Sequence, residues 1–123
     1  ERVFVLAGRV LELYVAVLGA FKAGAVVCPL FSAFGPEPLA TRMTLGDARV
    51  LVTTDTLYAR KVASLRERLP GLRHVILLTE SGAPAGVPGT HDWSTLLAEC
   101  STDFEIVPTN ADSIALLHFT SGT

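Results

Sequence analysis

The residues best suited to chemistry lie at 119–123, Phe-Thr-Ser-Gly-Thr, directly after an apolar run at 113–118. Small hydroxyl residues around a glycine suit a loop that wraps phosphate, because glycine lets the backbone approach and hydroxyl and N–H groups donate to anionic oxygens. The Gly-x-x-x-x-Gly-Lys-Ser/Thr pattern of a Walker-type loop is absent. Taken alone, a Ser/Gly/Thr tail is also typical of a frayed terminus. The candidate phosphate-binding residues are Thr120, Ser121, Gly122 and Thr123.

A second group of candidates is basic and lies on one predicted helix. Arginine binds phosphate through two parallel hydrogen bonds, so this helix could meet a phosphorylated ligand. The simpler interpretation is a solvated helix face. The basic residues concerned are Arg60, Lys61, Arg66 and Arg68.

The other polar residues of chemical interest have simpler structural interpretations. His118 lies in an apolar run and is expected to be a satisfied core histidine. His74 and His91 show no neighbours in the sequence that indicate metal binding or acid–base work. Asp55 and Asp92 stand where they would cap helices.

Composition limits the class of protein. The chain has 123 residues, half of them hydrophobic and 18% charged, which is typical of one globular domain. The net charge of −2 argues against a partner that is nucleic acid or an anionic membrane. The longest apolar stretch, 10–23, is too short for a bilayer, and we expect no cleavable signal. Cys28 and Cys100 match no metal or redox spacing, so buried, reduced thiols are expected. We expect a soluble cytoplasmic domain.

Strand and helix patterns alternate along the chain. This alternation predicts an α/β fold with a largely parallel sheet and helices on both faces. Pro29 should end its strand or lie near a sheet edge, and Gly24 should end the preceding helix in the left-handed conformation. The all-round apolar helix at 10–23 should be deeply buried. The expected strands are 3–7, 25–29, 49–53, 74–79 and 113–118, and the expected helices are 10–23, 36–46, 55–69 and 93–97.

Three segments together resemble the adenylate-forming ligases, the superfamily of acyl-CoA synthetases, luciferases and peptide-synthetase adenylation domains. They are Leu18-Gly-Ala-Phe-Lys-Ala-Gly-Ala-Val-Val-Cys-Pro-Leu30, Phe31-Ser-Ala-Phe-Gly-Pro-Glu-Pro38 and Thr120-Ser-Gly-Thr123. The stretch from Pro29 to Glu37 resembles the acetate–CoA ligase branch most. The family's phosphate loop continues as Thr-Gly-x-Pro-Lys, and this chain holds only the first four positions of the loop.

The resemblance implies that residues 1–123 are a partial N-terminal AMP-binding domain, cut inside the phosphate loop and without a separate second domain. The parent enzyme would use ATP, Mg²⁺ and CoA to convert a carboxylic acid, acetate by resemblance, into acyl-AMP and then acyl-CoA. Thr120 to Thr123 would hold the ATP phosphates, and Arg60 and Lys61 would lie near CoA. The isolated piece should be inactive, and the family's acyl pocket lies downstream. The alternatives are a peptide-synthetase adenylation domain, a longer-chain acyl-CoA ligase, or a stand-alone, non-catalytic nucleotide-binding module.

Overall fold

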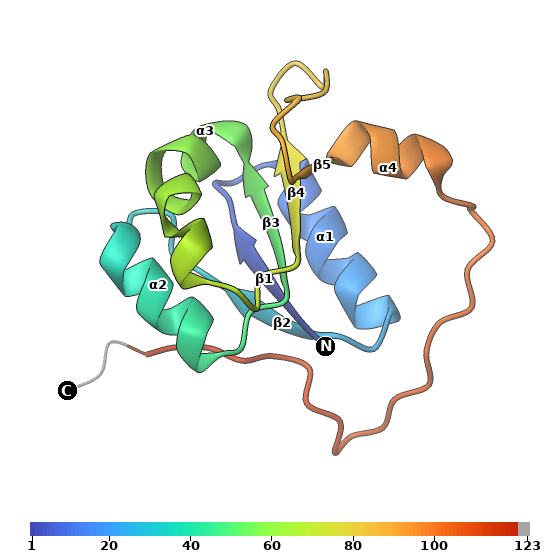
Figure 1. Ribbon diagram of the computed structural model, residues 1–123. Coiled ribbons are helices and arrows are strands. Elements are labelled where there is room, and N and C mark those ends of the chain that lie inside the picture. Colours follow the sequence, from blue (N-terminus) through green and yellow to red (C-terminus); the bar gives the residue numbers. More distant parts are fainter. Residues whose placement is uncertain (121–123) are drawn as a thin grey trace.

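A five-stranded, entirely parallel sheet forms the centre of the computed structural model, which describes residues 1–120 (Figure 1). The strand order across the sheet is β2-β1-β3-β4-β5, so the chain crosses over between strands rather than folding into hairpins. The predicted parallel α/β fold is therefore confirmed. The strands are β1 (Arg2–Leu6), β2 (Val26–Pro29), β3 (Val50–Thr54), β4 (His74–Leu78) and β5 (His91–Asp92).

Helices cover both faces of this sheet (Figure 1). One face carries α2 and a continuous but irregular helix, in which a short α segment passes into a π-helical turn and then a 3₁₀ turn. The other face carries α1. The helical elements are α1 (Leu11–Lys22), α2 (Pro36–Leu45), α3 (Asp55–Leu57), the π segment η1 (Tyr58–Val62), the 3₁₀ segment η2 (Ala63–Arg68) and α4 (Trp93–Glu99).

The strands divide their side chains between the two faces of the sheet, because successive residues of a strand point to opposite faces. The larger cluster lies between the sheet and the α2/η1/η2 side. Four residues at helical spacing, predicted to form one apolar face, are all buried there: Tyr58, Val62, Leu65 and Leu69. On the other side, Ala16 and Ala20 of α1 pack over small clusters from the strands.

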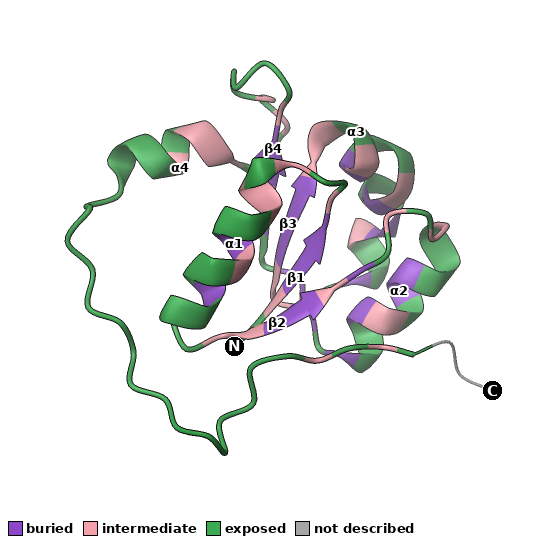
Figure 2. Ribbon diagram, turned by 180° about the vertical axis from the view of Figure 1, so that it is seen from behind, coloured by how far each residue is buried: buried purple, intermediate pink, exposed green. Residues whose placement is uncertain are grey.

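Helix α1 is less buried than its sequence predicts. Most of α1 is exposed (Figure 2). Of its residues only Ala16 and Ala20 are buried, whereas Leu11 is 74% and Leu18 is 61% exposed. The prediction of a deeply buried helix is wrong for the described chain. The reason is geometric: α1 is the only helix packed over β1 and β2 on its face, so nothing among residues 1–120 covers its outer side.

The predicted final strand at 113–118 is also wrong. Residues 113–118 run beside the edge strand β2 but form a single parallel bridge, Val27 with Leu116. Two hydrogen bonds hold it, from Val27 N to Ala115 O and from Leu117 N to Val27 O, each 2.9 Å long. Since β2 has only four residues and ends at Pro29, its outer edge offers few groups for pairing. The fifth strand is instead the two-residue β5, which carries no apolar pattern to predict it.

Helix starts differ from the expected caps. Thr54, not Asp55, caps α3, since its Oγ1 accepts a hydrogen bond from Leu57 N at 3.2 Å. The Asp92 carboxylate accepts from Ala85 N at 2.6 Å and so ties down the preceding loop instead of capping α4.

The predictions that Cys100 and His118 are buried are also wrong. Cys28 is fully buried, but Cys100 is exposed. His118 is exposed and therefore is not a core histidine. Both misplaced residues lie in the segment from Cys100 to Thr120, which forms no helix or strand of its own.

Candidate functional site

The segment that leads to the expected phosphate loop lies beside the end of α2. The ring of Phe119 is 6.4 Å from that of Phe4, measured between centroids. A methyl group built on Gly46, the residue that ends α2, would come within 3.1 Å of the Phe119 ring. Thr120 follows as an exposed residue, and residues 121–123 lie outside the described part of the chain. What the loop binds therefore stays a prediction.

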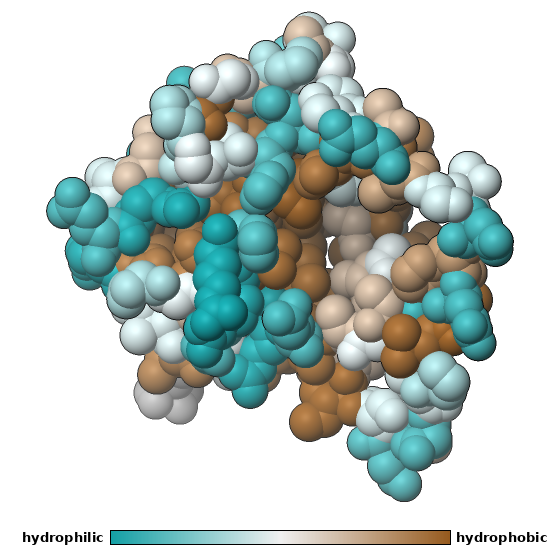
Figure 3. Space-filling view, turned by 45° about the vertical axis from the view of Figure 1, so that its right-hand side comes forward, coloured by the Kyte–Doolittle hydropathy of each residue, from teal (hydrophilic) through white to brown (hydrophobic). Residues whose placement is uncertain are grey.

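Residues 100–120, which we call the C-terminal strap, wrap around the body of the molecule (Figure 1). Val107 N donates to Lys22 O at 2.9 Å, and the Val107 side chain lies over Gly24. Gly24 has a φ of 67°, as predicted for a left-handed helix end. A hollow of about 520 Å³ opens between the strap and the body, where apolar side chains are exposed (Figure 3).

Lys61 joins the basic segment to the loop after β2. Its ammonium group donates to Ser32 O at 2.5 Å and to Phe34 O at 2.8 Å. The loop is braced further by an edge-on contact between the rings of Phe31 and Phe34, with centroids 5.5 Å apart. The Arg42 guanidinium lies 4.2 Å from the centroid of Phe34 on the α2 side. Lys61 therefore ties the loop at 31–35 to the basic segment.

The other basic residues of this segment differ in what they contact. Arg68 binds Glu37 with two hydrogen bonds, of 2.6 and 2.9 Å, which lower the pKa of the Glu37 carboxyl together with the charge of Arg68. One terminal nitrogen of Arg66 is buried and finds no partner within residues 1–120. Arg60 is exposed, and its guanidinium makes no hydrogen bond to any other described residue. Arg60 is therefore exposed and, unlike Lys61 and Arg68, is not engaged by a described side chain or carbonyl.

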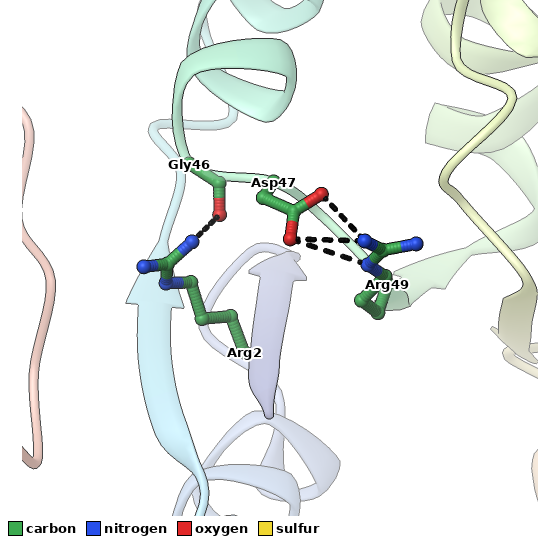
Figure 4. Close-up of polar contacts among 4 residues, drawn as sticks. All are labelled: Arg2, Gly46, Asp47 and Arg49. Carbon is green, nitrogen blue, oxygen red and sulfur yellow. Dashed lines mark hydrogen bonds and ion pairs between the residues drawn. The ribbon is translucent and has the colours of Figure 1, made fainter.

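A polar cluster at the start of the strands was not anticipated (Figure 4). Arg2 Nη1 donates to Gly46 O at 3.0 Å and so satisfies a carbonyl at the end of α2. Arg49 Nε and Nη2 donate to Asp47 Oδ2 at 3.3 and 3.2 Å. Asp47 has a φ of 49°, the left-handed position that follows a helix end. The cluster therefore closes α2 against β1 and β3; its only trace in the sequence is the Gly-Asp pair at 46–47.

The described residues hold neither a metal-binding cluster of three or more side chains nor a helix that could span a membrane. No group of three or more His, Cys, Asp or Glu side chains comes together anywhere within residues 1–120. No helix in this part of the chain has the length and apolar character needed to cross a bilayer.

Comparison with known proteins identifies the family. Residues 1–123 match the family described as AMP-binding enzyme. The chain is 36% identical to an acetyl-coenzyme A synthetase of Novosphingobium aromaticivorans and 33% identical to one of Bacillus subtilis, in both cases over its whole length. It spans about a fifth of the length of these relatives. A crystal structure of a Brucella canis acyl-CoA synthetase matches all of this chain and 22% of its own, with a TM-score of 0.85 and 28% identity. The chain belongs to the family of AMP-binding enzymes.

Proposed function

We propose that this chain is part of an AMP-forming acyl-CoA ligase whose acid substrate is acetate. The observation that carries the proposal is the family match over every residue, together with 36% and 33% identity to two bacterial acetyl-coenzyme A synthetases. The activity is proposed for a polypeptide of the relatives' length that carries this sequence. The 123 residues alone should be inactive, because catalysis needs substrates positioned by a complete site. The same proposal places the enzyme in the cytoplasm, where ATP and CoA are both supplied.

The proposed reaction has two steps. A carboxylate oxygen attacks the α-phosphorus of ATP, and the bond to the pyrophosphate oxygen breaks to give acyl-AMP. The CoA thiolate then attacks the acyl carbonyl carbon, and AMP leaves. In this proposal Thr120, Ser121, Gly122 and Thr123 donate hydrogen bonds to the departing pyrophosphate and stabilise its growing charge.

Mg²⁺ would neutralise phosphate charge in this reaction. Within residues 1–120 no cluster of carboxylates stands ready to hold the ion. The described residues therefore do not fit a dedicated Mg²⁺ site.

For CoA we propose a division of labour between the two neighbouring basic residues. Arg60 is exposed and would contact a CoA phosphate. Lys61 already donates to Ser32 O and Phe34 O, so its contribution would be to hold the loop at 31–35 beside the ligand. If Lys61 turned toward a phosphate it would lose these two hydrogen bonds, and that loss would offset part of the binding free energy of the new contact.

The test separates the two half-reactions in a polypeptide of the relatives' length. Acetate-dependent exchange of pyrophosphate into ATP reports the first step, and release of AMP on addition of CoA reports the second. Thr123→Ala should slow exchange by roughly 10²–10³-fold, the usual cost of losing one donor to transition-state charge. Arg60→Ala should leave exchange unchanged and raise the KM for CoA.

Matched controls make the outcome specific. Arg66→Ala removes an arginine of the same segment and should leave exchange unchanged. Normal exchange in Thr123→Ala combined with loss in Arg66→Ala would reverse the assigned roles. Exchange with a longer acid or an amino acid, but not with acetate, would favour the longer-chain ligase or the peptide-synthetase domain. Binding of ATP without exchange for any acid would favour the non-catalytic module.

A further inference from the structure

Two histidines from different strands face each other on the surface. His74 Nδ1 and His91 Nε2 are 3.2 Å apart, and the ring centroids are 5.4 Å apart with a tilt of 38°. Both residues are exposed. The backbone brings them together: His74 begins β4, His91 begins β5, and His91 pairs in register with Ile76. His74 and Ile76 lie on the same face of β4, because side chains two apart along a strand point the same way.

The chemistry of this pair is that of a two-nitrogen chelate. A neutral imidazole has one nitrogen with a free lone pair, so one ring can donate to the other or each can offer a lone pair to a cation. Bonds from nitrogen to zinc are about 2.0–2.1 Å long. Two such bonds to nitrogens 3.2 Å apart would meet at the ion at about 100°, which lies between square-planar and tetrahedral angles. Small ring rotations, which exposed side chains allow, would turn both lone pairs toward that point.

We propose that His74 and His91 bind one divalent transition-metal ion of the Zn²⁺, Ni²⁺ or Cu²⁺ class at the β4–β5 edge. Imidazole donors suit these ions, whereas Mg²⁺ prefers oxygen. Water completes the coordination, since no third His, Cys, Asp or Glu joins the pair within residues 1–120. The site is separate from the proposed ligase chemistry and needs neither ATP nor CoA.

Binding would have a structural consequence. β5 has only two residues, and the chain between Leu78 and His91 forms no helix or strand. An ion held by both histidines would clamp β5 onto β4 and close this loop. Stability rises because the two imidazoles are held together only in the folded chain, which therefore binds the ion more tightly than the unfolded chain does. Bound metal should therefore raise the melting temperature.

The test uses the chain with Cys100→Ser, which removes the exposed thiol as a competing ligand. Calorimetric titration with Zn²⁺ and Ni²⁺ should give one ion per chain, and Cu²⁺ should show coupling to two imidazole nitrogens in its electron paramagnetic resonance spectrum. His74→Ala and His91→Ala should each weaken binding at least about tenfold, since losing even a contact that supports a ligand costs about 10–100-fold. His118→Ala is the matched control, because His118 is exposed and distant from the pair in sequence, and it should bind normally.

A measurement without substitutions in the pair guards against loss of folding. Zn²⁺ should shift the imidazole nitrogen resonances of His74 and His91 and leave those of His118 in place. The proposal is overturned if the double variant His74→Ala/His91→Ala binds as tightly as the parent. It is equally overturned if binding depends on His118, or if millimolar metal leaves both imidazole signals unmoved.

Discussion

Gly46 is the point where α2 ends and where the first strand and the C-terminal strap meet. A Cβ atom built on it would lie 2.5 Å from Cζ of Phe4 and 3.1 Å from Cζ of Phe119. Its backbone, with φ of −86° and ψ of 5°, is open to any residue. Phe4 is fully buried in the larger apolar cluster, so its ring has little room to move away. Gly46→Ala therefore tests steric packing without backbone strain.

The expected loss of stability in Gly46→Ala follows from the close contact between the new Cβ atom and the Phe4 ring. A separation of 2.5 Å is shorter than real contacts to a Cβ atom allow, so either the ring or the end of α2 must shift. Overpacking of this kind costs about 1–3 kcal/mol in the free energy of unfolding. Gly19→Ala, inside α1, is the matched control, because a Cβ there meets nothing within 4 Å. It should instead stabilise the chain by roughly 0.5–1 kcal/mol, through helix propensity.

Urea unfolding followed by circular dichroism measures both variants on one scale. A double-mutant cycle then identifies the cause, since Phe4→Leu removes the Cζ atom that a new methyl group would strike. In that background Gly46→Ala should cost less, with a coupling of about 0.5–3 kcal/mol. If Gly46→Ala behaves like Gly19→Ala, or if the cycle shows no coupling, the packing argument at this junction is wrong.

Three further predictions concern charge and reactivity. Hydrogen bonds and charge from Arg68 lower the pKa of Glu37. The pair's contribution to folding stability is therefore present above the ordinary pKa range of glutamate and is lost as pH falls through the lowered pKa. Arg68→Gln should raise the Glu37 pKa in an NMR titration. Burial raises the pKa of the Cys28 thiol to about 11, so iodoacetamide at mildly alkaline pH should modify Cys100 alone, and two modified thiols in the folded chain would contradict this. Asp47→Gly should relieve left-handed backbone strain worth about 1 kcal/mol. At about 1 M salt, which screens the ion pair between Asp47 and Arg49, denaturation should show the variant to be more stable than the parent. Equal stability of the two proteins at this salt concentration would count against the strain.

Much of the fold could be predicted from local patterns. Alternating strand and helix signals indicated the parallel α/β sheet, and Pro29 indicated the edge position of β2, because proline cannot donate in the middle of a sheet. Gly24 takes the expected left-handed conformation, and the spacing of Tyr58, Val62, Leu65 and Leu69 marked one buried face. These features depend on backbone sterics and on the periodicity of a single segment. They are therefore visible without knowing what the segment packs against.

Other features were decided only by the tertiary structure. The outer side of α1 is exposed although its residues are apolar, because burial depends on what covers a helix and not on its composition. Lys61 anchors the loop after β2 across 27 and 29 positions of sequence, a contact that no local spacing indicates. His74 and His91 appeared unrelated in the sequence until parallel pairing of β4 with β5 placed their rings together. Contacts between distant segments follow from sheet order and register, and these are set by the packing of the whole chain.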